Sequence, residues 1–154
     1  MSENKKAREY KLFIPGRPYT KKNSGRYVGH GRYLPSKQFC AYEDRSLPVL
    51  NAHKRNLGLI EPIDYPVEVT ALYVMDSRSG WPDLVGLMQA TADLLEDAGI
   101  LLDDRVIVSW GTTHIAKVDR KQPGVGIRIR EWTDTEWFNP LELDPFYKRR
   151  KKDV

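Results

Sequence analysis

The sequence lacks the residues and motifs that several large protein classes depend on. Its 154 residues include one cysteine, Cys40, so no disulfide can form within the chain. It contains no CxxC or HExxH pair, no phosphate-cradling glycine loop and no G-x-S-x-G elbow. These absences argue against a disulfide scaffold, a zinc protease, a P-loop nucleotidase and an α/β-hydrolase.

Long apolar runs, internal repeats and low-complexity segments are also missing. No stretch resembles a signal peptide or a membrane span, so we expect a cytoplasmic protein with no membrane partner and no small-molecule cofactor. The length suits one domain, since a chain of this size can bury roughly 70% of its unfolded surface. We predict a domain over residues 1–131 and a C-terminal extension over 132–154.

Histidine is scarce as well. His30, His53 and His114 are widely scattered, and a lone histidine is more often a surface or core residue than a ligand. Any metal chemistry must therefore come from carboxylates. Carboxylates without histidine or cysteine partners suit a hard cation such as Mg²⁺.

Positive charge is in excess: the net charge is +4 and the pI is near 9.1, although the chain has 21 acidic residues. This excess favours an anionic partner, and the many acidic residues imply that the basic residues that bind it are grouped on one part of the surface. The stretch 16–37 is the candidate, because it interleaves cations with tyrosines that could stack on exposed bases. Its predicted nucleic-acid contacts are Arg17, Lys21, Lys22, Asn23, Arg26, Arg32 and Lys37. A solvated hairpin whose tyrosines pack on the core is the other interpretation, and composition does not separate the two.

Hydrophobic periodicity predicts an α+β fold with a small mixed sheet of about four strands and two main helices. Ser36 is a possible N-cap for the first helix, and Pro48 is expected to kink or restart it. The strand over 67–75 is apolar on both faces and should be central. The predicted strands cover 10–14, 67–75, 106–108 and 125–129, and the helices cover 36–56 and 84–98.

The second predicted helix is bracketed by acids. Pro82 and Asp83 suit its first turn, and Gly99 suits its end. Its apolar side is formed by Leu84, Leu87, Met88, Thr91, Leu94, Leu95 and Ala98. Asp83, Gly86, Asp93 and Asp97 fall on the other side, and Asp103-Asp104 follow the glycine.

Simple distances limit which acids can share an ion. Asp83 and Asp93 are about 15 Å apart at ~1.5 Å per helical residue, too far to share one ion, so Asp93 is expected to support the metal ligands from outside or to be structural. The extended chain from Gly99 to Asp104 covers ~17 Å, which allows Asp104 to return to Asp83. If Asp103 and Asp104 are both extended, only one can be a direct ligand. The unremarkable alternatives are a helix cap at Asp83 and a turn at the Asp-Asp pair.

Two regions resemble the RusA family of Holliday-junction resolvases, which is common in bacteriophages and prophages. They are IPGRPYTKKNSGR with LPSKQFCAYE, and PDLVGLMQATADLLEDAGILLDDRVIV, so the likeness covers about residues 10–131. The resemblance implies a small α+β homodimer that binds four-way DNA junctions. With Mg²⁺, or Mn²⁺ as a substitute, it would make paired symmetrical nicks during DNA recombination and repair.

Matched position by position, the family's acids fall on Asp83, Asp93, Asp103 and Asp104. The resemblance therefore implies catalytic roles for Asp83, Asp103 and Asp104, with Asp83 and Asp104 as the principal metal ligands and Asp103 adjoining them.

The chain departs from the family's pattern at three places. Val85, Gly86 and Gln89 stand where the family has a second aspartate, an asparagine and a lysine. Gln89 is a candidate catalytic residue because its amide still donates and accepts hydrogen bonds. The departures keep two alternatives open: a branched-DNA-binding protein of weak or lost activity, and a basic adaptor for recombination proteins.

The C-terminal extension is rich in aromatic residues before it ends in the basic run 148–152. We expect its aromatic part to dock on the domain and its basic end to remain free. The aromatic residues are Trp132, Trp137, Phe138, Phe146 and Tyr147.

Overall fold

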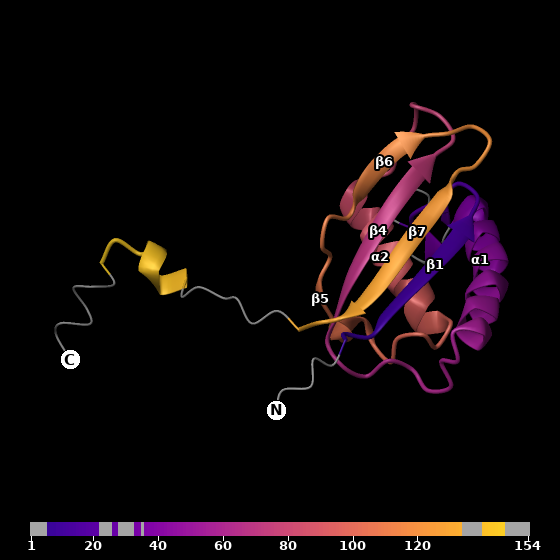
Figure 1. Cartoon of the computed structure of the whole chain (residues 1–154). Helices are drawn as coiled ribbons and strands as arrows, with labels where there is room; N and C mark the ends of the chain where they lie inside the picture. The colour runs from indigo at the N-terminus through magenta and orange to yellow at the C-terminus, as the bar shows by residue number, and fades with distance from the viewer. Residues whose placement is uncertain (1–5, 22–25, 28–32, 35, 134–139, 147–154) are drawn as a thin grey trace.

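The computed structural model describes residues 6–21, 26–27, 33–34, 36–133 and 140–146. A five-stranded mixed sheet lies at its centre, with two helices packed behind it (Figure 1). The fold is therefore α+β, as the sequence predicts, with one more strand in the main sheet than expected.

The sheet is built around β4 (Val67–Met75). On one side β4 pairs antiparallel with β7 (Gly124–Glu131), which pairs antiparallel with β1 (Glu9–Pro15). On its other side β4 pairs in parallel with β5 (Ile107–Ser109) and β6 (His114–Val118). The predicted central position of β4 is confirmed.

Both helices cover the same face of the sheet (Figure 1). In α1 (Lys37–Asn56) the Ser36 hydroxyl accepts a hydrogen bond from the Phe39 N–H at 3.0 Å, which confirms the predicted N-cap. The helix does not restart at Pro48, which lies inside it. The second helix, α2, spans Leu84–Asp97 and follows β4.

The core lies between this sheet face and the helices. Alternate residues of each strand point towards the helices because side chains alternate along a strand. The predicted inward residues of α1 are buried, as are most of those of α2. The largest fully buried side chains are Tyr42, Tyr73, Phe39, Ile14, Leu50, Met75, Leu87, Leu94, Leu95, Ile100, Leu101 and Ile129. The opposite face of the sheet has no helix over it in the described part of the chain (Figure 1).

The predicted strand over 106–108 is displaced in the structure. Residues Asp104–Val106 form a short 3₁₀ helix, η1, and β5 follows it. Strand β6 was not predicted, because its exposed Ala116 and Lys117 break the apolar alternation. In the basic stretch, β2 (Arg26–Tyr27) and β3 (Tyr33–Leu34) form a small separate hairpin.

The C-terminal extension is only partly described. The Trp132 N–H donates to the Pro66 carbonyl at 3.0 Å, and a 3₁₀ helix, η2, spans Pro140–Leu143. Phe146 is 58% exposed, while Trp137, Phe138 and Tyr147 lie outside the described residues. Docking of the aromatic part therefore stays a prediction. Within the described ranges, neither helix combines the length and apolarity that a bilayer crossing requires.

Candidate metal and nucleic-acid site

The end of α2 determines where the Asp103-Asp104 pair lies. Gly99 adopts φ 71°, a left-handed conformation that glycine tolerates, and turns the chain back along the helix. The buried residues Ile100 and Leu101 follow. The Ile63 N–H donates to the Ile100 carbonyl at 2.8 Å, and the Leu102 N–H donates to the Ile63 carbonyl at 3.0 Å. These bonds fix the return path up to Asp103.

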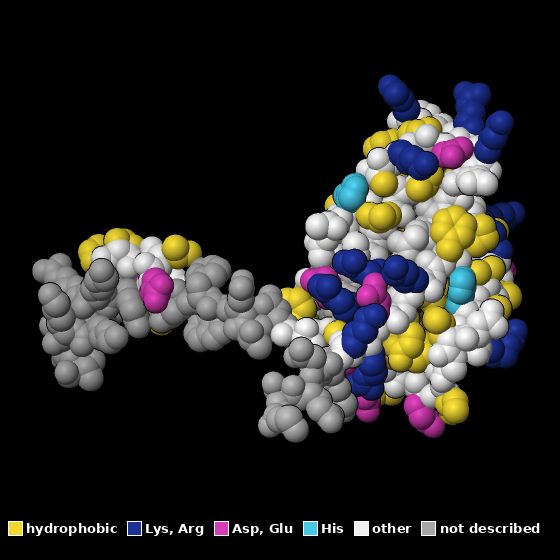
Figure 2. Space-filling model, in the orientation of Figure 1, with side chains coloured by type: hydrophobic (Ala, Val, Ile, Leu, Met, Phe, Trp, Pro, Cys, Tyr) yellow, Lys and Arg dark blue, Asp and Glu magenta, His cyan; other side chains and the backbone are white. Residues whose placement is uncertain are grey.

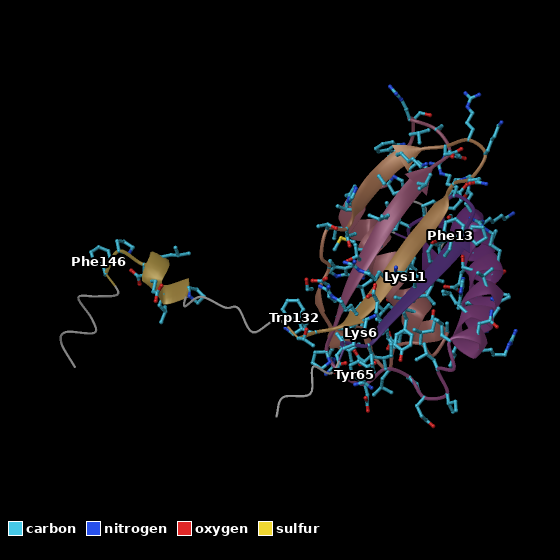
Figure 3. The ribbon with its side chains drawn as sticks, viewed as in Figure 1. Lys6, Lys11, Phe13, Tyr65, Trp132 and Phe146 are labelled. Atoms are coloured by element: carbon cyan, nitrogen blue, oxygen red, sulfur yellow. The ribbon has the colours of Figure 1, made fainter. Side chains whose placement is uncertain are left out.

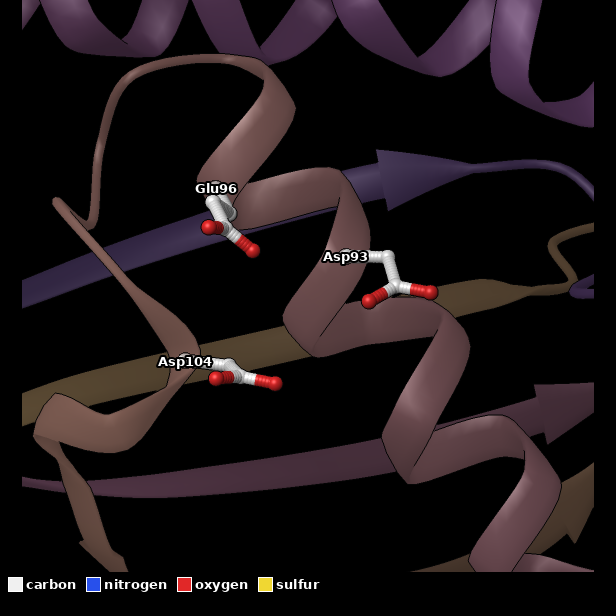
Figure 4. A group of neighbouring side chains, drawn as sticks. All are labelled: Asp93, Glu96 and Asp104. Carbon is white, nitrogen blue, oxygen red and sulfur yellow. The ribbon is translucent and has the colours of Figure 1, made fainter.

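Asp103 then starts a tight turn. Its backbone is extended and its carboxylate accepts the Arg105 N–H at 2.8 Å, which caps η1. Asp104 is the first residue of η1, and its side chain faces α2 (Figure 4). The two aspartates thus have different tasks: Asp103 shapes the turn, and Asp104 is presented to the helix.

Three carboxylates meet at this place. Oxygens of Asp93, Glu96 and Asp104 all lie within 4.8 Å of one another, with Asp93 and Glu96 projecting from successive turns of α2 (Figure 4). We call this group the acidic cluster. Oxygen ligands at such separations suit a hard divalent cation, which accepts carboxylates together with water.

The pKa values reflect the crowding of negative charge. The pKa of Glu96 is raised by desolvation and by the charges of Asp103, Asp104 and Asp93. The pKa of Asp104 is raised by its side-chain hydrogen bond with Asp103, by desolvation and by neighbouring negative charge. The pKa of Asp103 is lowered because the Arg105 N–H and Asp104 donate to its carboxylate. A bound cation would relieve this repulsion.

A cationic side chain adjoins the acidic cluster. Lys21 Nζ lies 3.4 Å from Asp93 Oδ2 and 5.5 Å from the centre of the Phe39 ring. Lys21 also lines a cavity of about 240 Å³ with Gly86, Gln89, Ala90 and Asp93. An anionic group entering this cavity would find the ammonium group and the Gln89 amide as donors, with the acidic cluster at the cavity's edge.

Asp83 lies at the beginning of α2, beside Gly86, which lines the cavity. It occupies the N-cap position of α2, although its side chain makes no capping hydrogen bond. A Cβ atom at residue 86 would stand 2.6 Å from Asp83 Oδ1 and 3.3 Å from a Thr20 methyl. Gly86 is buried, and the absence of a side chain there leaves space for the Asp83 carboxylate over the helix.

The structure changes the expected grouping of the acids. Asp104 lies with Asp93, which is about 15 Å from Asp83 along α2, so Asp83 and Asp104 of one chain cannot bind the same ion. Asp93 was expected to support the ligands from outside or to be structural, whereas its carboxylate lies in the acidic cluster. Glu96 was missed, although its three-residue spacing from Asp93 places both on one side of a helix.

The predicted nucleic-acid contacts are divided by the structure. Arg17 is engaged internally: its guanidinium donates to Asp76 at 3.1 Å and to the Gly80 carbonyl at 2.8 Å. The Asp76 carboxylate is in turn paired with the Arg17 guanidinium. Lys37 is exposed in the first turn of α1, and Arg26 lies in β2. Lys22, Asn23 and Arg32 lie outside the described residues.

No model of a known protein family matches this chain, and no curated protein matches it significantly. The resemblance to the RusA family thus stays a prediction from two stretches of sequence. What the chain can do has to be argued from its own side chains.

Proposed function

We propose that this chain is a RusA-like homodimeric endodeoxyribonuclease that cuts four-way DNA junctions in a Mg²⁺-dependent reaction, with Mn²⁺ as an alternative ion. The observation that supports this most is the acidic cluster beside a cavity lined by a lysine and a glutamine. Carboxylates supply oxygen ligands for the ion, while the lysine and the amide supply donors for a phosphodiester. A protein that only binds DNA gains nothing from carboxylates beside phosphates.

In the proposed site, Asp104, Asp93 and Glu96 hold the ion. The bound ion would activate water and neutralise charge on the phosphate during hydrolysis. Asp103 positions Asp104 by capping η1, and its carboxylate adjoins the site. Without a cation the clustered charges repel DNA, so loading of the site and productive DNA binding should be linked.

The cavity orients the phosphodiester. Lys21 offers an ammonium group that Asp93 holds near the acidic cluster, and Gln89 offers an amide from the same turn of α2 as Ala90. Asp83, whose carboxylate lies over Gly86, would adjoin this cavity rather than the ion. In a homodimer, two such cavities would account for paired nicks on opposite strands. The exposed cations of the basic stretch, such as Lys37, would bind the junction arms.

The decisive test is cutting of a synthetic four-way junction by the full-length protein in Mg²⁺ and in Mn²⁺. Asp104→Asn should abolish nicking while junction binding persists or tightens, because one ligand charge is lost at nearly constant shape. Asp97→Asn is the matched control, since Asp97 is an exposed acid at the end of the same helix. A wild-type protein that binds the junction but makes no nicks with either ion would contradict the nuclease function.

A junction-binding protein of weak or lost activity is the second candidate. It is favoured by Val85, which is 66% exposed in the first turn of α2, where the family has an acid. If the chain is a junction-binding protein, the double variant Val85→Asp/Gln89→Lys should nick junctions, whereas the wild-type protein should not. If the nuclease is correct, the wild-type protein already nicks and the double variant changes mainly its dependence on low Mg²⁺.

The proposed dimer is tested separately by light scattering of the purified chain. A single species of twice the monomer mass supports the paired-nick arrangement. A monomer that nicks only one strand would support the hydrolytic site but contradict the RusA-like homodimer.

A further inference from the structure

The face of the sheet that points away from the helices carries its own pattern, which follows from the strand register. Lys11 of β1 stands opposite Arg128 of β7, which stands opposite Thr70 of β4. Two residues along each strand, Phe13, Gly126 and Leu72 form the next row. The two rows are about 7 Å apart at ~3.4 Å per residue. We call this surface the open face.

The second row contains a gap. A Cβ atom at Gly126 would meet no heavy atom within 4 Å, whereas its neighbours Phe13 and Leu72 are 44% and 40% exposed. Two strand spacings of ~4.8 Å separate these neighbours, so a planar ring fits over the glycine between them. The Phe13 ring leans along β7 over Gly124, where a Cβ atom would stand 2.6 Å from Phe13 Cζ, so it leaves the space over Gly126 open and offers its aromatic surface beyond the gap (Figure 3).

A cavity of about 360 Å³ joins the gap to the cationic row. Its lining includes Lys11, Arg128, Thr70, Leu72 and Gly126. The Thr70 hydroxyl is buried and finds no hydrogen-bond partner within the part of the chain that the structure describes. The cavity thus combines positive charge, a hydroxyl group and apolar walls.

Positive charge prevails across the middle of the open face. Figure 2 shows Lys and Arg side chains gathered there beside apolar ones. Glu68 offsets part of this charge, because its Oε1 lies 3.1 Å from Arg130 and 3.9 Å from Arg128. Lys11 is exposed on β1 (Figure 3). An anion therefore has a favourable place on the first row, at Lys11.

We propose that the open face binds an unpaired nucleic-acid strand, with a phosphate on the row of Lys11 and Arg128 and a base over Gly126 beside Phe13. Cations together with an aromatic platform are the combination that binds single strands, because every base has a surface that can stack. A duplex would use the cations but leave the gap empty, since its bases are already stacked.

The other occupants fit less well. A second copy of the chain would set the cationic row against a like charge in a symmetric contact, which is unfavourable. The segment Pro140–Phe146 has an aromatic residue for the gap, but its Asp144 already accepts the Phe146 N–H at 2.9 Å, which leaves less negative charge for the cationic row. A nucleic-acid strand matches both the charge and the gap.

This surface is separate from the proposed hydrolytic site. The acidic cluster is formed by α2 and η1, which lie on the helix-covered side of the sheet (Figure 1). Binding on the open face does not depend on a metal ion or on the proposed nuclease activity. At a branch point, it would allow one molecule to contact an unpaired strand on one side and a phosphodiester on the other.

The test uses the full-length protein with EDTA present and a fluorescent oligothymidine, so that hydrolysis plays no part. Gly126→Val should fill the gap, since an added Cβ atom would meet no heavy atom within 4 Å, and a β-branched residue suits a strand, so the melting temperature should be kept. We expect the affinity for oligothymidine to fall by roughly 5- to 100-fold, the range for loss of one stacked base. Affinity for a blunt duplex should change by less than about twofold.

A second variant tests the cationic row. Lys11→Glu should weaken oligothymidine binding and reduce the salt dependence of log K by about 0.7 for the lost phosphate contact. Lys54→Glu, a basic residue near the end of α1, is the matched control and should have a smaller effect. An unchanged oligothymidine affinity in both Gly126→Val and Lys11→Glu would overturn the proposal. A Gly126→Val protein that loses self-association instead would assign the face to a second copy.

Discussion

The two ends of helix α2 are both acidic, but only one of them is crowded. At its beginning, the exposed Asp83 carboxylate lies over Gly86, and no group of three acids among the described residues includes it. At its end, Asp93 and Glu96 are met by Asp104, which the return loop brings back. The loop after α2 causes this difference, rather than the helix itself. The β-bridge between Ile63 and Leu101 fixes the position of this loop and so the place at which Asp104 meets the helix.

This comparison shows why counting acids in the sequence is not sufficient to locate an ion. Asp83 has the position that the family resemblance marks, whereas the acidic cluster has the spacing that an ion requires. A cation is attracted to the place where negative charges already repel one another, since its binding removes that repulsion. The two ends should therefore respond differently to the same kind of substitution.

The largest expected effect is on metal affinity. Asp104→Asn should lower the affinity for Mn²⁺ by roughly 10- to 100-fold, because a charged ligand is lost from the acidic cluster. Asp83→Asn should leave that affinity within about twofold, since Asp83 is ~15 Å from Asp93 along the helix. Isothermal titration calorimetry of both variants measures the difference. The reverse order of effects would move the ion to the beginning of α2.

The next effect concerns the cavity between the two ends. Lys21→Ala should reduce junction nicking by about 10- to 100-fold, because a donor to the phosphodiester is removed. Junction binding should fall much less, since Lys21 is one of several cations. Lys37→Ala, at the exposed start of α1, is the control, and should affect binding and nicking equally. Comparing the single-turnover rate with the dissociation constant separates the two roles.

A smaller effect should appear with pH. Protons compete with a cation at Glu96, whose pKa is raised mainly by desolvation, and at Asp104, whose pKa is raised mainly by its side-chain hydrogen bond with Asp103. The affinity for Mn²⁺ should therefore continue to rise with pH beyond the range in which ordinary carboxyl groups finish titrating. In Glu96→Gln the rise should be shallower. A wild-type affinity that is flat beyond that range would contradict the shared ion.

The smallest effect is on stability without metal. The folded-state pKa of Glu96 is raised, so its protonated form is favoured in the folded chain, and that contribution is lost as pH rises through the raised pKa. Glu96→Gln should thus slightly raise the melting temperature at neutral pH and not in acid. Asp97→Gln is a suitable comparison at the same end of α2. Thermal unfolding in EDTA at two pH values measures both variants.

Much of the fold could be predicted from the sequence, because local patterns determine it. The Ser36 cap, the apolar side of α2 and the alternation in β7 are signals carried by neighbouring residues. Strand β6 escaped prediction because its pairing with β4 compensates for a weak local pattern. For the same reason the pairing of five strands could not be read from the chain alone.

The candidate site was less predictable. The acids on α2 could be found, since helical spacing is regular, but the distance from Gly99 to Asp104 only set an upper limit on where Asp104 lies. The turn at η1 shortens that path and turns Asp104 towards Asp93. Glu96 could have been included from its spacing. The ion pair of Arg17 with Asp76 could not be predicted, because Asp76 lies in a loop without a regular repeat.

The pairing of β1 with β7 has a consequence for how the chain is made. Glu9 stands opposite Arg130, so the first strand finds its sheet partner only when almost the whole domain exists. During synthesis β1 stays unpaired while α1, β4 and α2 leave the ribosome. The apolar side chains of Leu12 and Ile14, which are buried in the folded chain, are exposed during this time. Pairings this distant in sequence close slowly, and such unpaired strands are prone to associate with other chains. Arrested nascent chains that stop before Gly124 should therefore bind chaperones, and chains released after Glu131 should escape them.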